Sequence, residues 1–389
     1  MQFLTSGKMM VERSRTMTFS NIPGLQGVKQ VLSEAAKTNH TAHAQLFVGT
    51  DGALNLPLAL AFATYLHCEN KGDDSCGTCS ACSKNSKLIH PDTHFVFPLS
   101  NIKNDKDEER FKAEIRKSWR TFLTENPFGT LDDWTNSYGG EDKQALISRE
   151  ESREIVKALS LKPFESQHKV MIIWQPELMH PSAANGILKI LEEPPPHTYF
   201  ILVTNAADRL LSTIISRTQI VTVPLLSDEE VEGYLVDKHG VEVSRAQRTA
   251  QLADGNLNLA IKLLDNEEDN NTLRFTEWMR ACFKRNYGTL VSIAEEYHGL
   301  DKLSQRNVMS YSINMMRETM LHVSGASAIN RATGDELKFV QDFSKVMNLE
   351  KIEKSFKLMN DASYHLERNG SAKMIFLDLS LNLSKTLNP

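Results

Sequence analysis

The hydrophobic positions between residues 167 and 218 change their period twice. Residues 170–174 form a short apolar run, long enough for a strand buried on both faces of a parallel sheet. Apolar residues then recur at helical spacing through 187–191, in a segment that Pro181 can begin and that residues 194–196, all proline, must end. Residues 199–204 are again apolar, with β-branched and aromatic side chains. This order of strand, helix and strand predicts a βαβ unit and an α/β fold.

The second half of the chain carries helical patterns only. Ser227, followed three positions later by Glu230, has the spacing of a capping box at a helix start. From Thr272 onward, periods near 3.6 dominate. Leucines in residues 377–383 alternate as in a strand, but they also fit a helical stripe that ends at Leu387. Segment length and surroundings favour the helix.

A glycine-containing loop follows the short apolar run at residues 45–48. A phosphate-binding loop needs glycines whose backbone N–H groups surround phosphate, a lysine for the β- and γ-phosphate oxygens, and a Ser or Thr for Mg²⁺. Gly49 and Gly52 are present, but Asn55 stands at the lysine position and Leu56 at the hydroxyl position. The loop therefore predicts a degenerate nucleotide site.

The acidic residues of a nucleotide site are missing as well. An ATPase with such a phosphate-binding loop needs two acidic residues at the end of a second buried strand. At the end of the apolar run 170–174, Trp174 and Gln175 stand there instead. Together with the changes in the loop, these substitutions argue against ATP hydrolysis and productive ATP binding. The alternative is that residues 49–56 never formed a phosphate-binding loop, although the strand before them and the helix after them favour a degenerate one.

Four of the five cysteines fall in one short window. Two overlapping C-x-x-C steps, with a fourth thiol eight positions earlier, can close a tetrahedral site with four sulfur ligands; the residues are Cys68, Cys76, Cys79 and Cys82. Disulfides or unpaired core thiols are the alternatives, and disulfides would require an oxidising compartment. The pattern predicts structural zinc without a catalytic role, because no coordination position is left for water. Cys282 stands alone and is expected in the core.

Composition excludes several classes of protein. At 389 residues, two or three domains are expected, and 41% hydrophobic residues can bury a substantial core. The net charge of −5 gives no overall basic surface for nucleic acid. No apolar run reaches 18 residues, and residues 1–17 lack the hydrophobic segment of a signal peptide. A cytoplasmic protein without a membrane segment is expected.

Two segments resemble a known family. AANGILKILEEPP, followed by LLSTIISRT, is similar to the core of the clamp-loader subunits of bacterial DNA polymerase III, which belong to the AAA+ class of ATPase folds. The resemblance is close over residues 18–228 and loose elsewhere. It implies an AAA+-type parallel-sheet domain with an inserted zinc module, a small helical lid and an all-α C-terminal collar domain.

The resemblance also implies domain boundaries. Residues 1–16 would be an N-terminal extension, and 17–226 the AAA+-like domain, with the zinc module at 68–82 and an insertion at about 95–144. Residues 227–266 would form the helical lid, and 270–389 the collar through which subunits oligomerise. The insertion departs from the family pattern and its function is not evident, but its aromatic residues predict that part of it docks; they are Trp119, Phe122, Phe128, Trp134 and Tyr138.

The function implied by the resemblance is that of a non-hydrolysing clamp-loader subunit, part of the polymerase holoenzyme without being catalytic itself. It would help load the sliding clamp onto primed DNA, in a five-subunit ring with delta and gamma/tau subunits. Ser216 and Arg217 match the family's turn whose arginine enters a neighbour's ATP site as a finger. Asn258 stands where the family's lid carries a sensor arginine. The alternatives are an ATP-hydrolysing clamp-loader subunit and a zinc-module nucleic-acid-binding protein.

Overall fold

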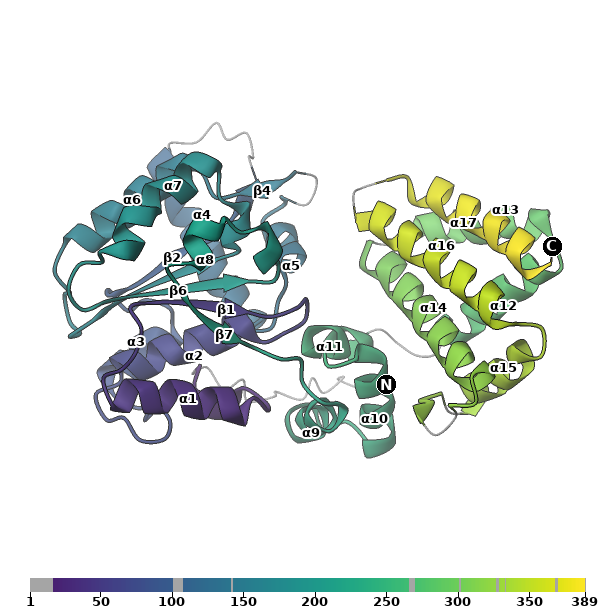
Figure 1. Ribbon diagram of the computed structural model, residues 1–389, viewed down its shortest axis with the longest axis horizontal. Coiled ribbons are helices and arrows are strands. Elements are labelled where there is room, and N and C mark those ends of the chain that lie inside the picture. Colours follow the sequence, from purple (N-terminus) through teal and green to yellow (C-terminus); the bar gives the residue numbers. More distant parts are fainter. Residues whose placement is uncertain are drawn as a thin grey trace, which may run out of the picture. The chain divides into compact units, whose positions relative to one another are not determined.

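The computed structural model describes residues 17–100, 108–140, 143–265, 270–300, 302–326, 329–332, 334–367 and 370–388. The chain divides into two compact units, with the boundary between Asp265 and Asn266. The proposed N-terminal extension, residues 1–16, lies outside the described residues. Figure 1 shows an α/β unit and a helical unit, which are described separately.

A five-stranded parallel sheet forms the centre of the first unit. The strands lie in the order β2–β5–β6–β1–β7, so the first strand sits between the fourth and the fifth of this sheet. Their bounds are β1 (Ala44–Val48), β2 (Thr93–Val96), β5 (Lys169–Trp174), β6 (Thr198–Thr204) and β7 (Gln219–Thr222). Because the strand order reverses at β1, the carboxyl end of β1 is where a doubly wound sheet binds ligands.

Helices cover both faces of the sheet (Figure 1). On one side lie α1 (Gln26–Lys37), α2 (Asn55–His67) and α3 (Ser80–Ser86); on the other lie α6 (Arg149–Ser160), α7 (Pro181–Glu192) and the short α8 (Ser212–Ile215). Every residue of α2 is buried, which explains its unbroken apolar sequence. Helix α7 begins with Pro181 as its first residue and ends just before the three prolines.

Alternating side chains of the strands build two cores. In β5, Val170, Ile172 and Trp174 join a cluster on the α2 side, whereas Met171 and Ile173 join a second cluster with α6 and α7. This division follows from the two-residue period of a strand, which sends successive side chains to opposite faces. The strand therefore has to be apolar at every position, as its sequence is.

The insertion between β2 and α6 forms a small structure of its own. Strands β3 (Leu99–Ser100) and β4 (Ala145–Leu146) pair antiparallel at its base. Helices α4 (Glu108–Glu125) and α5 (Leu131–Ser137) follow between them. Part of the charge-dense segment at 101–117 is thus helical from Glu108, and Ile115 within it is buried. Residues 101–107 and 141–142 lie outside the described residues.

Three helices end the first unit: α9 (Asp228–His239), α10 (Val243–Ala253) and α11 (Leu257–Asp265). We refer to them as the three-helix segment. Helix α9 starts with the predicted capping box, in which the Ser227 side chain accepts from the Glu230 N–H and the Glu230 carboxylate accepts from the Ser227 N–H. Gly240, in a left-handed conformation, ends this helix.

The described residues of the second unit form helices without any strand: α12 (Asn270–Phe283), α13 (Tyr287–Gly299), α14 (Lys302–Val323), α15 (Gly334–Ser344), α16 (Leu349–Glu367) and α17 (Ala372–Leu387). Phe376 of α17 stacks on Trp278 and Tyr297 at centroid distances of 4.5 and 4.2 Å. The leucine-rich C-terminal segment is helical, as its length favoured. Helix α12 begins at Asn270, the first residue of the expected collar.

The structure therefore confirms the predicted parallel α/β sheet and the helical C-terminal region. Ile147 pairs with Met179 in a β-bridge before helix α6, and Leu161, 68% exposed, follows this helix. Among the described residues, no helix combines the length and hydrophobicity that a bilayer crossing requires.

Candidate functional site

The loop after β1 lies at the ligand-binding end of the sheet. The Gly49 N–H donates to the Thr204 carbonyl at the end of β6, 3.2 Å away, so the loop is attached to the neighbouring strand. A Cβ at Gly49 would lie 2.6 Å from that of Ala53, which requires glycine there. Gly52 has a φ of +86°, a conformation that L side chains rarely adopt. The conformation of this loop therefore depends on both glycines.

Asn55 uses its side chain inside the protein. Its Nδ2 donates to the carbonyl oxygen of Thr204 at 2.9 Å and to Oδ1 of Asn205 at 2.8 Å. Its own Oδ1 accepts from the Leu56 N–H at 3.1 Å. Both amide hydrogens are therefore in use, and the side chain is buried. A lysine at this position would direct a charge towards a phosphate, whereas Asn55 links α2 to β6.

The residues at the other three positions also contribute to the fold; they are Leu56, Trp174 and Gln175. Leu56 is 3% exposed within the core beneath α2, and Trp174 is 3% exposed in the same cluster. Gln175 takes a left-handed conformation, with φ of 56°, and its N–H donates to the Val203 carbonyl at 2.8 Å. None of these three side chains supplies an acid or a hydroxyl for a metal ion bound to phosphate.

A half-buried carboxyl near this position escaped the sequence analysis. Glu177, three residues beyond Trp174, accepts a hydrogen bond from Thr204 Oγ1 at 2.9 Å. Burial raises the pKa of Glu177 above its usual value, against the hydrogen bond from Thr204, which lowers it. Glu177 and Asn55 thus share Thr204 as a partner. The signal in the sequence was an acidic residue just after a fully apolar strand, close to the missing acids.

The three-helix segment lies directly against the glycine loop. A Cβ at Gly52 would lie 2.4 Å from the side chain of Asn256, just before α11. Asn258, at the expected sensor position, is buried, and its amide donates to Asp133 of the insertion at 2.9 Å. Both asparagines are therefore in contact with protein groups.

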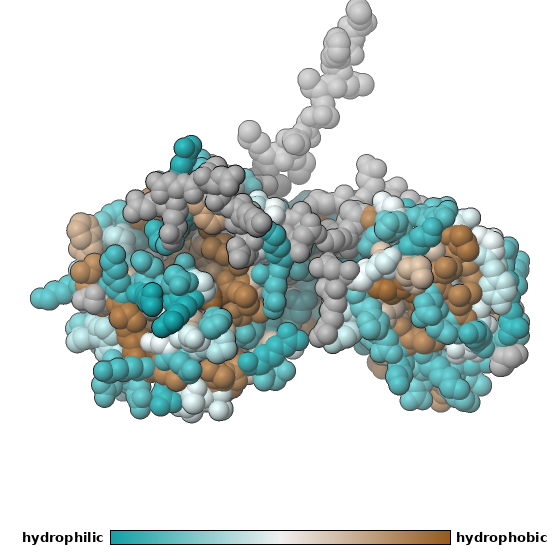
Figure 2. All heavy atoms as spheres, turned by 90° about the horizontal axis from the view of Figure 1, so that it is seen from above, coloured by the Kyte–Doolittle hydropathy of each residue, from teal (hydrophilic) through white to brown (hydrophobic). Residues whose placement is uncertain are grey.

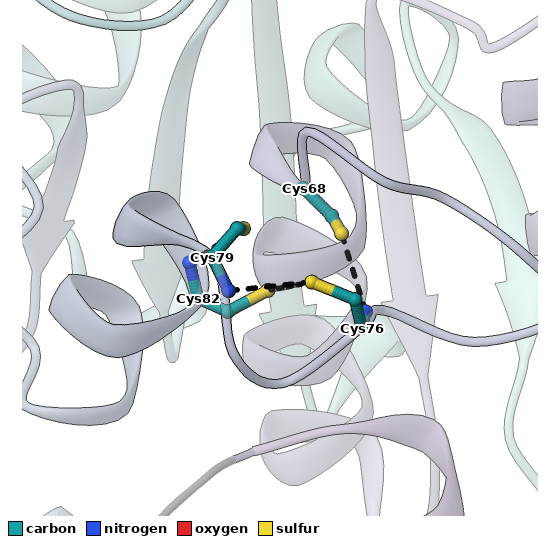
Figure 3. A group of neighbouring side chains, drawn as sticks. All are labelled: Cys68, Cys76, Cys79 and Cys82. Atoms are coloured by element: carbon teal, nitrogen blue, oxygen red, sulfur yellow. Dashed lines mark hydrogen bonds between the residues drawn. The ribbon is translucent and has the colours of Figure 1, made fainter.

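The four clustered cysteines are brought together between α2 and α3 (Figure 3). Their sulfur atoms all lie within 4.8 Å of one another, and those of Cys76 and Cys82 are 4.0 Å apart. Cys68 ends α2, Cys79 caps α3, and Gly77 supplies the left-handed turn between them, with φ of +70°. Four thiols at this separation are a donor set that can hold one metal ion tetrahedrally.

Backbone N–H groups point at the sulfur atoms. The Cys76 N–H donates to the Cys68 sulfur at 3.2 Å, and those of Cys79 and Cys82 donate to the preceding cysteine sulfurs at 3.4 Å each. Hydrogen bonds from the N–H groups of Thr78 and Cys79 lower the pKa of the Cys76 thiol to about 6. Burial, by contrast, raises the pKa of Cys68 and Cys82. A cation would counteract that burial effect by stabilising the thiolates.

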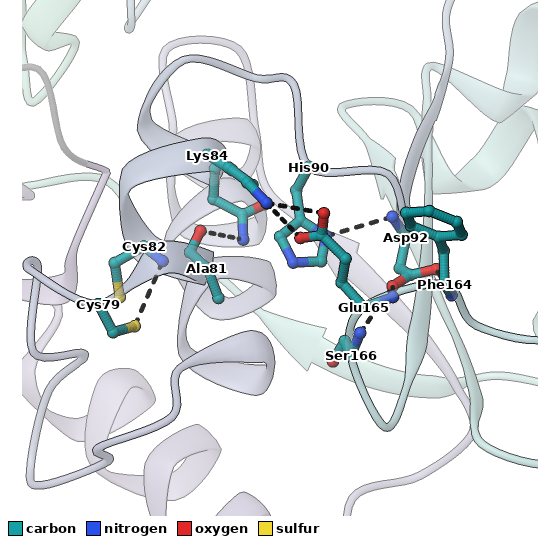
Figure 4. Close-up of polar contacts among 10 residues, drawn as sticks. Cys79, Ala81, Cys82, Lys84, His90, Asp92, Phe164, Glu165 and Ser166 are labelled. Atoms are coloured by element: carbon teal, nitrogen blue, oxygen red, sulfur yellow. Dashed lines mark hydrogen bonds and ion pairs between the residues drawn. The ribbon is translucent and has the colours of Figure 1, made fainter.

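A second polar group links the cysteine module to the sheet (Figure 4). The buried Asp92 carboxylate accepts the N–H groups of Phe164, Glu165 and Ser166 at 2.6, 2.8 and 2.8 Å. Burial opposes ionisation of Asp92, but these three hydrogen bonds outweigh it and lower its pKa. Lys84 of α3 pairs with Glu165 at 2.6 Å. The loop before β5 is therefore fixed beside the cysteines.

Arg217 lies in the turn between α8 and β7, outside the polar network around Asn55. Its Nη1 donates to the Thr213 carbonyl at 3.0 Å and to Ser216 Oγ at 3.4 Å. Its Nη2 pairs with Glu192 at 3.2 Å, and its side chain is 30% exposed. Glu192 ends α7, so the guanidinium lies at the surface between two helix ends.

Comparisons with known proteins fit this architecture. The model of the family described as "DNA polymerase III, delta subunit" matches residues 24–227. The delta′ subunit of Bacillus subtilis (strain 168) is 30% identical over 242 residues, which cover 62% of this chain and 59% of the relative. The gamma subunit of Buchnera aphidicola (subsp. Acyrthosiphon pisum, strain APS) is 25% identical over 264 residues, covering 66% and 61%. The chain thus spans about three fifths of the length of these relatives.

A solved structure of a DNA polymerase III gamma subunit-related protein from Thermotoga maritima is also similar. The two sequences are 13% identical, and the match covers 92% of this chain and 99% of the Thermotoga chain. The TM-score of 0.41 marks a remote similarity. The family match, in contrast, covers more than half of the 389 residues. The protein therefore belongs to the DNA polymerase III delta-subunit family of clamp-loader proteins and resembles its delta′ members.

Proposed function

We propose that this protein is a non-hydrolysing, delta′-like subunit of the DNA polymerase III clamp loader. It would help to load the sliding clamp onto primed DNA as a member of a five-subunit ring with delta and gamma/tau subunits. The observation that carries the proposal is the hydrogen bonding of Asn55 to Thr204 and Asn205, because the group at the lysine position is fully used within the fold. Such a site retains a phosphate loop's backbone but offers no cation to phosphate.

Calorimetry and ATP turnover by the isolated chain test this proposal. We expect no binding at millimolar Mg-ATP and no hydrolysis above background, because Asn55 and Leu56 supply neither a cation nor a hydroxyl and Trp174 and Gln175 supply no carboxylate. The matched comparison is a gamma subunit of the same loader under the same conditions. A micromolar dissociation constant or measurable turnover would instead favour an ATP-hydrolysing subunit. The gamma-type relatives would then be the better guide to the function of this chain.

The cysteine cluster is proposed to hold one structural zinc ion. Support comes from the four thiols within 4.8 Å and from the N–H groups directed at them. Zinc would join the end of α2 to the start of α3, and all four ligands would come from this module. With no position left for water, the ion would supply folding energy and no chemistry.

Arg217 is proposed to act on a neighbouring subunit's ATP. A guanidinium aimed at the transferring phosphoryl group stabilises its developing charge, which can be worth about 10³–10⁵ in rate. Ser216 is exposed and the Arg217 side chain is partly exposed, which supports this role, since a finger has to lie at the surface of its own subunit. Glu192 would hold the guanidinium in the free chain and release it or orient it when the neighbour docks.

The two helical parts are proposed to serve as lid and collar. The three-helix segment, residues 228–265, lies against the glycine loop as a lid would, and the second unit would join the ring. Figure 2 shows hydrophobic residues among the hydrophilic surface of both units. In the second unit, large apolar side chains on four different helices are 41–64% exposed, including Leu273, Val291, Leu349 and Met374. Such side chains are available for subunit contacts.

A further inference from the structure

The insertion contacts the sheet at the place of the missing acids. The ring of Trp174, at the end of β5, lies 5.2 Å from that of Trp119 and 6.4 Å from that of Phe122, both in α4. Trp134 of α5 packs edge-on against Trp119 at 5.0 Å, and its Nε1 donates to the Pro98 carbonyl at 2.9 Å. The aromatic side chain that replaced an acid is therefore the anchor of the insertion.

The same insertion also contacts the three-helix segment through an aromatic pair. Phe128, between α4 and α5, meets Tyr234 of α9 edge to face, with centroids 5.6 Å apart and an interplanar angle of 87°. Gly129 follows, and a Cβ there would lie 2.6 Å from the Phe122 ring. The loop can approach the aromatic cluster so closely because it carries glycine at this position.

Asp133 makes a third contact, with α11. Its carboxylate accepts from Lys262 Nζ at 2.6 Å and from Asn258 Nδ2 at 2.9 Å, and it closes the capping box of α5 with Thr130. The Lys262 and Asp133 side chains are 21% and 15% exposed. Burial opposes ionisation of Asp133, but Lys262 and these hydrogen bonds lower its pKa below the usual value. A pair this sheltered is screened little by solvent.

A single hydrophobic cluster joins all three parts. It contains Trp174 and Ile172 of the sheet, Trp119 and Trp134 of the insertion, and apolar residues from each helix of the three-helix segment, among them Val231, Leu235, Ala246, Ala250, Leu257 and Ala260. Because one core spans sheet, insertion and segment, the segment cannot move from the glycine loop without opening contacts with the insertion.

We propose that the insertion is a strap that holds the three-helix segment against the sheet in the absence of nucleotide. Its anchor is Trp174, and its fastenings are the Phe128–Tyr234 contact and the pairing of Asp133 with Lys262 and Asn258. Two positions that a nucleotide-binding relative would use for ATP, Trp174 and Asn258, thereby receive partners from the insertion. The segment keeps one placement whether or not ATP is present.

Hydrogen exchange followed by mass spectrometry on the full-length chain tests the strap. Asp133→Asn removes the charge partner of Lys262, so we expect amides in residues 228–265 to exchange about tenfold faster or more, because breaking a sheltered ion pair populates local opening. Amides of β5 and β6 should keep their wild-type rates. The matched control is Asp132→Asn, an exposed carboxylate in the same first turn of α5, which should leave both regions unchanged.

A second variant keeps the proposal testable if Asp133→Asn disturbs α5 itself. Lys262→Met leaves the Thr130–Asp133 capping box intact and should accelerate exchange in the same residues. Mg-ATP should not slow exchange in 228–265 of the wild-type chain. The strap is wrong if both variants leave these amides at wild-type rates, if the sheet accelerates equally, or if Mg-ATP alone protects the segment.

Discussion

The polar groups at the two ends of helix α2 have different partners. At its first residue, Asn55 is hydrogen-bonded to Thr204 and Asn205, and the glycine loop before it has no cationic side chain for a phosphate. At its other end, Cys68 and three further thiols converge within 4.8 Å. At one end the polar side chain is paired with protein groups, whereas the other end presents four thiols that can bind a metal ion.

This difference shows how polar groups that are paired within the protein can be told from groups that are available to a ligand. A polar side chain that has found protein partners stabilises the fold by itself, and a ligand would have to break those hydrogen bonds. Clustered thiols cannot satisfy one another, because ionised sulfurs repel and neutral ones are weak hydrogen-bond partners. The cysteine end of α2 can therefore be stabilised by a cation, whereas the Asn55 end is stabilised by protein groups.

The largest effect on stability is expected from removing one of the four cysteine ligands. Cys82→Ser removes one of four ligands, so bound zinc should fall from one per chain towards none. The melting temperature should fall by roughly 10 °C, because structural zinc contributes several kcal/mol of folding energy. Elemental analysis and thermal unfolding measure both quantities.

Ser80→Ala is the control for this change, since Ser80 is an exposed residue within the same module. It should retain zinc and the wild-type melting temperature. If the wild-type chain, purified without chelator, contained no metal, the proposed zinc site at the end of α2 would be wrong.

A substitution at Asn55 should reduce stability less than the loss of a cysteine ligand. Asn55→Leu removes the amide that donates to Asn205 Oδ1 and to the Thr204 carbonyl, which then keeps only the Gly49 N–H. The loss of these hydrogen bonds should lower the free energy of unfolding by about 1–3 kcal/mol. Urea unfolding measures the change, with Thr50→Ala in the exposed part of the loop as control. In the double variant Asn55→Lys, Leu56→Thr, we expect no gain of ATP binding, since the acids remain absent. Micromolar binding by that variant would contradict our account.

Glu177 provides a pH-dependent test of the same end. Its pKa is raised in the folded state, so the wild-type chain loses stability as pH rises through that pKa. The free energy of unfolding of Glu177→Gln should therefore exceed that of the wild type at pH 7 by up to about 1 kcal/mol. This difference should shrink when the pH falls below the unfolded-state pKa. Urea unfolding at pH 4 and pH 7 measures it. An advantage that grew on acidification would show that the sign is wrong.

The smallest effect on the isolated chain is expected for Arg217. Arg217→Ala breaks a surface pair with Glu192, so the free energy of unfolding should change by no more than about 0.5 kcal/mol. Clamp- and DNA-stimulated ATP turnover of the reconstituted loader should fall nonetheless, and Arg217→Lys should rescue it poorly, because an ammonium lacks the forked geometry of guanidinium. Arg248→Ala, another exposed arginine, is the control. Unchanged turnover would leave Arg217 as a surface residue.

Much of the fold could be predicted from local signals. The apolar run of β5 predicted a buried strand, Pro181 marked the start of α7, and the Ser227 and Glu230 pair marked the start of α9. Each of these depends on residues that are near one another in the chain, so the sequence carries the full information. The cysteine cluster belongs to the same class, since its four thiols come from a 15-residue window.

Only the tertiary structure decided which side chains are paired with Asn55 and Asp133. The partner of Asn55 lies 149 residues away in the chain, and that of Asp133 lies 129 residues away. Neither contact has a spacing that a sequence pattern could reveal. The sequence by itself determined which groups are missing at Asn55 and Trp174 and which thiols are present. The packing of sheet, insertion and three-helix segment determined which distant side chains meet there, because long-range contacts depend on the whole topology and on no local period.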